Sequence, residues 1–154
     1  MKLAGILVGV MLIAVGVVGC GGDGGDETTV VKADFVKQAN AVCLKAAKKR
    51  DATAQAAFRA QEKLPQAESE SEIEKSEWVL ARVIRPLAEM SDELAALSVP
   101  GESADEAEAV SAAFQEAIDE VEAEPTQVVK GEVNPFGKPK KLAGEYGIKA
   151  CATI

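Results

Sequence analysis

A run of apolar residues at alternating three- and four-residue spacing constrains the fold of this chain more than any other feature. Its members would share one face of a helix, and they are Ile73, Leu80, Val83, Leu87, Met90, Leu94 and Leu97. Such a stripe is typical of the inner seam of a helical bundle. Two overlapping capping boxes, Ser69 with Glu72 and Ser71 with Glu74, predict the start of this helix. Pro86 removes one backbone hydrogen bond and predicts a kink within it.

Two further segments carry apolar residues at helical spacing. The segment before the seam is predicted to begin at the N-cap Asp34 and to run towards Lys63. The segment after it is predicted to begin with a capping box of Ser103 and Glu106 and to stop at Pro125. Their expected inward-facing residues are Phe35, Ala39, Val42, Ala46, Thr53, Ala57 and Ala60 in the first, and Ala107, Val110, Phe114, Ala117, Ile118 and Val121 in the second.

A fourth, shorter helix is predicted near the end of the chain. Asn134 is its candidate N-cap, followed by Pro135 in the first turn, and Gly147 is its candidate left-handed C-cap with Ile148 packed behind it. Its expected inward-facing residues are Phe136, Leu142, Ala143 and Tyr146. The sequence does not decide whether residues 126–133 form a loop or an extended segment. Because the connections are short and no useful length alternates with period two, we expect an all-α fold, an up-down-up-down four-helix bundle over residues 34–154.

The composition excludes several classes of function. The chain has a formal net charge of −8, and this sign argues against nucleic acid as a partner because phosphate binding needs a basic surface. It contains no histidine, which removes the usual general base and the commonest metal ligand. Glu68, Glu70, Glu72 and Glu74 alternate along a helix start and do not converge on one point. We therefore expect no catalytic residues, no metal site and no cofactor, and interpret the chain as a protein that is not an enzyme.

The first residues have the layout of a secretory signal peptide. Lys2 supplies one positive charge, residues 3–18 are apolar apart from glycine, and the small Gly19 precedes Cys20. The segment Val-Val-Gly-Cys at 17–20 resembles the lipobox of bacterial lipoproteins. This resemblance implies cleavage after residue 19 and the attachment of a diacylglyceryl group and of acyl chains such as palmitate to Cys20. An uncleaved transmembrane helix is the alternative, because residues 3–22 are about long enough to span a bilayer.

Lipidation at Cys20 would fix the location of the protein. Two or more acyl chains hold a protein on a membrane where one does not. Residues 20–33 are rich in Gly and Asp and are predicted to be a flexible tether between the lipid and the helical body. The expected localisation is the cell membrane, with the body on its extracytoplasmic face.

Two cysteines, Cys43 and Cys151, remain once Cys20 is assigned to the lipid. An even number of cysteines in an oxidising compartment favours a disulfide. In an antiparallel bundle the short last helix could bring its end to the middle of the first, near Cys43. A redox pair and free buried thiols are the alternatives, although neither cysteine lies in a Cys-x-x-Cys motif.

The cysteine segments carry a further resemblance. The lipobox, the polar tether, Asp-Phe-Val-Lys-Gln-Ala-Asn-Ala-Val-Cys at 34–43 and Ala-Gly-Glu-Tyr-Gly-Ile-Lys-Ala-Cys at 143–151 resemble a group of small, uncharacterised actinobacterial lipoproteins. The resemblance covers the whole chain, but only the lipobox and the two cysteine segments are specific. It implies a Cys43–Cys151 disulfide and brings no activity with it.

A membrane-anchored, non-catalytic binding or interaction module is the function that these features favour. Its partner would be an envelope protein or a small ligand, and a passive structural or spacer role in the cell envelope is the alternative. Trp78 and Met90 could line a groove, although residues of these types at helical spacing are more often core. The basic cluster Lys45, Lys48, Lys49 and Arg50 could touch anionic headgroups, although a solvated face that balances acidic helices is the more common arrangement.

Overall fold

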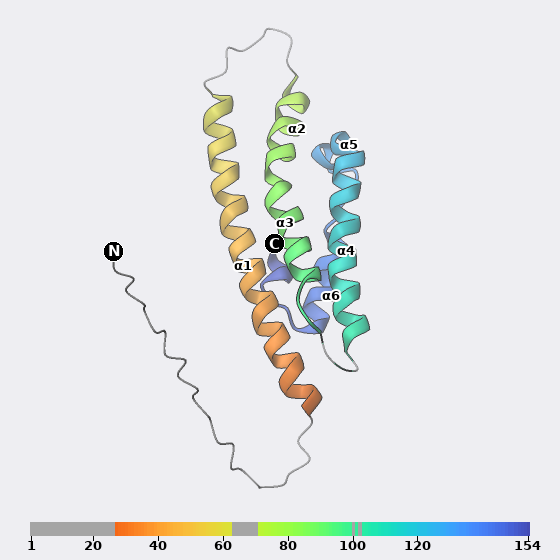
Figure 1. Cartoon of the computed structure of the whole chain (residues 1–154). Coiled ribbons are helices and arrows are strands. Elements are labelled where there is room, and N and C mark those ends of the chain that lie inside the picture. Colours follow the sequence, from red (N-terminus) through yellow and green to blue (C-terminus); the bar gives the residue numbers. More distant parts are fainter. Residues whose placement is uncertain (1–26, 63–70, 100, 102) are drawn as a thin grey trace, which may run out of the picture.

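The computed structural model describes residues 27–62, 71–99, 101 and 103–154, and every regular element in these ranges is helical. Figure 1 labels the six α-helices, and a 3-10 helix follows them. The elements are α1 (Glu27–Gln61), α2 (Glu72–Val83), α3 (Arg85–Ala95), α4 (Ala104–Ala123), α5 (Pro125–Lys130), α6 (Gly137–Tyr146) and η1 (Cys151–Thr153). The predicted all-α class is confirmed.

The long helices run alongside one another in alternating directions. In Figure 1 the chain ascends along α1, descends through α2 and then α3, and ascends again along α4. Helix α1 contacts α2, α3 and η1, while α4 contacts α3, α5 and α6. The short α6 therefore lies against α4, and the segment that follows it brings η1 to α1. One end of the molecule is closed by this C-terminal segment.

Helix α1 begins at Glu27, whereas the sequence predicts its start at Asp34. Asp34 lies inside the helix with an exposed side chain. No glycine or proline stands between Glu27 and Asp34 to end a helix, and one exposed Asp costs a helix little. The predicted N-cap is therefore wrong, and the first helix is longer at its N-terminal end than expected.

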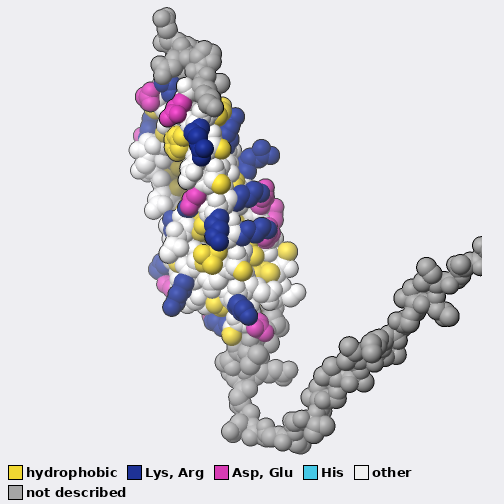
Figure 2. All heavy atoms as spheres, turned by 90° about the vertical axis from the view of Figure 1, so that its left-hand side faces the viewer, with side chains coloured by type: hydrophobic (Ala, Val, Ile, Leu, Met, Phe, Trp, Pro, Cys, Tyr) yellow, Lys and Arg dark blue, Asp and Glu magenta, His cyan; other side chains and the backbone are white. Residues whose placement is uncertain are grey.

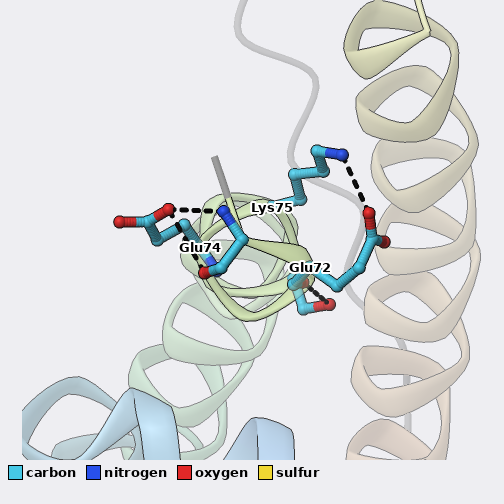
Figure 3. A network of polar contacts seen from close by, with 5 residues as sticks. Glu72, Glu74 and Lys75 are labelled. Atoms are coloured by element: carbon cyan, nitrogen blue, oxygen red, sulfur yellow. Dashed lines mark hydrogen bonds and ion pairs between the residues drawn. The ribbon is translucent and has the colours of Figure 1, made fainter. Parts of the chain in front are cut away.

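The start of α2 forms as the sequence predicts. The Glu74 N–H donates to Ser71 Oγ at 3.2 Å, and the Ser71 N–H donates to Glu74 Oε2 at 2.7 Å. These two bonds are the predicted capping box, and they satisfy two backbone donors at the helix end. Figure 3 shows Glu74 on one side of this turn and the ion pair of Lys75 with Glu72 on the other. The second predicted box uses Ser69, which lies outside the described residues.

Pro86 breaks the seam helix into two. Helix α2 ends at Val83, Ile84 caps both helices, and α3 begins at Arg85 with Pro86 in its first turn. Proline has no N–H to donate to the preceding turn, so the helix can continue only with a local break. The predicted kink is confirmed. Of the predicted seam, Leu87, Met90 and Leu94 are buried, whereas Ile73 at the start of α2 is 37% exposed and Val79, outside the predicted seam, is buried.

The apolar faces of the other helices follow the sequence closely. All six residues predicted for the helix after the seam are buried in α4. In α1, Phe35, Ala39, Ala46 and Ala57 are buried, whereas Ala60 is exposed. The core centres on Phe114 and Met90, which are almost fully buried. It lies between α1, α3, α4 and the C-terminal segment.

The predicted capping box at the start of α4 does not form. Ser103 makes no side-chain cap, and its Oγ instead accepts a hydrogen bond from the Tyr146 hydroxyl at 3.2 Å. Glu106 pairs with Lys32 of α1 at 3.5 Å. Both side chains of the predicted box therefore make tertiary contacts, which local spacing along the sequence does not reveal.

Residues 126–133, left open by the sequence, contain the short helix α5. Pro125 occupies its first turn, and Gly131 ends it with φ 73°. Glycine adopts this left-handed conformation without a steric penalty.

The predicted start of α6 is wrong and its predicted end is confirmed. Phe136 is the N-cap with no side-chain cap, and Asn134 contributes only its backbone carbonyl, which accepts from the Gly137 N–H at 3.2 Å. Gly147 has φ 102°, and the Ile148 N–H donates to the Ala143 carbonyl at 2.8 Å. This is the left-handed C-cap that the sequence predicts.

Candidate binding groove and the disulfide clamp

A disulfide joins α1 to η1. Cys43 and Cys151 are bonded, their Cα atoms lie 5.1 Å apart, and neither side chain is exposed. The pairing favoured by the sequence is thus confirmed, and the alternatives of a redox pair and of free thiols are not supported by this arrangement. Cys20, the predicted lipidation site, lies outside the described residues.

Polar contacts reinforce the disulfide on both sides. The Ala150 N–H donates to Asn40 Oδ1 at 2.8 Å, and Asn40 Nδ2 donates to the Val36 carbonyl at 2.7 Å. Arg50 Nη1 donates to the main-chain oxygen of Ile154 at 3.0 Å. Asn40 and Arg50 therefore hold the last residues against one face of α1, on either side of the disulfide. We call these contacts together the disulfide clamp.

Tyr146 closes the same end of the molecule. Its ring packs edge-on against Phe35, with ring centroids 5.7 Å apart, and Lys32 Nζ lies 4.2 Å above its ring centroid. Its hydroxyl reaches Ser103 at the start of α4. A single aromatic side chain thereby connects α6 to both α1 and α4.

An apolar groove of about 390 Å³ lies at the other end of α1, between α1, α2 and α5. We call it the α5 groove. Its lining residues are Ala54, Phe58, Ser76, Val79, Leu80, Val83, Val128 and Val129. Phe58 is 55% exposed, which is unusual for a large aromatic side chain. The lining contains one hydroxyl and no charged group, so its chemistry is that of an apolar binding surface.

Polar contacts hold the walls of the groove. Thr126 Oγ1 donates to Glu77 Oε1, which ties α5 to α2. Arg82 lies 3.3 Å from the Trp78 ring centroid and donates to the Trp78 carbonyl at 2.9 Å. Arg82, one turn further along α2, thus covers the Trp78 ring. Met90 is buried in the core. Neither of the two residues considered from the sequence lines this groove.

Phe58 is the groove residue that sequence reasoning missed. It falls outside the predicted inward-facing stripe of the first helix, in which alanine predominates. The sequence signal that could have indicated this site is a large aromatic residue on a face of the helix that is predicted to point outward. The sequence contained no comparable indication that α5 lines the groove, because it did not assign a secondary structure to residues 126–133.

The basic cluster on α1 pairs with acidic residues of α3. Lys45 Nζ lies 2.6 Å from Glu93 Oε1, and Lys49 donates to Glu89. The hydrogen bond from Lys49, together with the positive charges nearby, lowers the pKa of Glu89 below its ordinary value and outweighs the opposing effect of burial. Figure 2 shows basic side chains spread along the α1 face with acidic ones beside them. This pairing favours the solvated, charge-balancing interpretation of the cluster over a headgroup site.

Among the residues that the structure describes, no group of three or more His, Cys, Asp or Glu side chains could hold a metal ion. Within the same ranges, no helix has both the length and the apolar content needed to cross a membrane. Comparison with protein families, curated proteins and solved structures found no match for this chain.

Proposed function

We propose that this protein is an extracytoplasmic lipoprotein, anchored to the cell membrane through Cys20, and that its helical body is a non-catalytic binding module. The signal-peptide layout and the lipobox support the anchor. The buried Cys43–Cys151 disulfide is of the kind that persists in oxidising compartments. The alternating directions of α1, α2–α3 and α4 support an up-down-up-down four-helix bundle, in which α6 is the shortened fourth helix.

The α5 groove is the observation that carries the binding role. It combines an apolar lining with an aromatic side chain that is more than half exposed. A concave, mostly apolar lining with a single polar group is the usual form of a ligand-binding site. A passive spacer has no need of such a surface.

The anchor is tested by replacing Cys20 with Ser in the full chain expressed in its native host. Metabolic labelling with a palmitate analogue should label the parent protein and leave Cys20→Ser unlabelled and unprocessed. Equal labelling of the two proteins would rule out Cys20 as the site of attachment.

The binding role is tested by photo-crosslinking in the producing cells. A photoreactive phenylalanine analogue at position 58 should give a discrete adduct in the envelope. The matched control is the same analogue at position 44, because Leu44 lies on the same helix and is also 55% exposed. An adduct from position 58 that is absent from position 44 supports a binding groove.

The spacer role remains the second candidate, and one observation favours it. Ion pairs such as Lys45–Glu93 and Lys138–Glu116 join neighbouring helices across the described surface, and this arrangement suits a solvated, inert face. If positions 44 and 58 both give no adduct, the binding role fails and the spacer role takes its place.

A further inference from the structure

We draw no further inference here: the strongest candidate, the apolar groove between α1, α2 and α5, already carries the proposed binding role, and nothing in the described part of the chain shows what covers it.

Discussion

Helix α1 passes through two different surroundings, and the contrast between them is the main structural feature of this protein. At the clamp end, Phe35, Ala39, Cys43 and Ala46 are all buried. At the groove end, Ala57 is buried but its neighbour Phe58 is more than half exposed. The same helix therefore contributes to a closed core at one end and to an open apolar surface at the other.

The difference follows from the lengths of the elements that cover α1. α1 has 35 residues, whereas α6 has 10 and η1 has 3. The C-terminal segment can thus cover only part of one face of α1. The disulfide fixes that short segment at the clamp end, and the face beyond Arg50 is left to α2 and α5. We infer that the clamp end contributes more to stability than the groove end.

The largest expected effect comes from removing the disulfide. Cys43→Ala combined with Cys151→Ala should lower the free energy of unfolding by about 4 to 5 kcal/mol, since the bridge closes a loop across 108 positions of sequence and so restricts the unfolded chain. Denaturant unfolding of residues 27–154 measures this change.

Two controls belong to this experiment. The intact protein in the presence of reductant should approach the stability of the double variant. Reduction should also slow the migration of the unfolded chain on a gel. A double variant as stable as the parent would mean that packing alone holds the clamp end closed.

The next effect compares an aromatic residue of the closed core with the exposed aromatic residue of the groove. Phe114 is fully buried, and Phe114→Ala should cost roughly 4 kcal/mol through lost contacts and a cavity. Phe58→Ala should cost less than about 1 kcal/mol, because surface substitutions change stability little. Parallel denaturant titrations give both values, and similar losses from the two variants would erase the proposed division between the ends.

The distinction between local and tertiary features separates what the sequence predicts from what it does not. Six of the seven buried residues of α4 and the Gly147 cap of α6 are predicted correctly, because helical spacing and a left-handed glycine are local features. The Cys43–Cys151 pairing is predictable for a different reason, because the interpretation of Cys20 as the lipidation site leaves two cysteines and only one intramolecular bridge.

The groove end resists prediction because its geometry depends on tertiary contacts. On α2, Ile73 of the predicted seam is exposed, whereas Val79, outside the seam, is buried. The Ser103–Glu106 box fails for a related reason, because Ser103 binds Tyr146, which is distant in sequence. Local patterns cannot report such contacts.

A smaller effect should follow from weakening the clamp without touching the disulfide. Asn40→Ala would leave the Ala150 N–H without its acceptor, and the loss of one such partly buried bond should cost about 1 to 2 kcal/mol. Amide hydrogen exchange should accelerate at Ala150. Gln38→Ala serves as the control, because Gln38 is exposed on the same turn of α1 and should leave the exchange unchanged.

The smallest effect concerns Glu89, on the surface between the two ends. Its pKa is lowered chiefly by the hydrogen bond from Lys49, with further contributions from Lys45 and Arg85. A carboxyl group with a lowered pKa in the folded state stabilises the protein above its ordinary pKa, and this contribution is lost as the pH falls through the lowered value. Lys49→Ala should therefore raise the pKa of Glu89 towards its ordinary value, as measured by NMR titration of the carboxyl carbon. Added salt should produce part of the same change in the parent protein, since the group is exposed to solvent and screened. An unchanged titration in Lys49→Ala would mean that the Lys49–Glu89 ion pair does not persist in solution. The argument that acidic residues of α3 neutralise the basic cluster on α1 would then fail, and binding of anionic headgroups by this cluster would again be open.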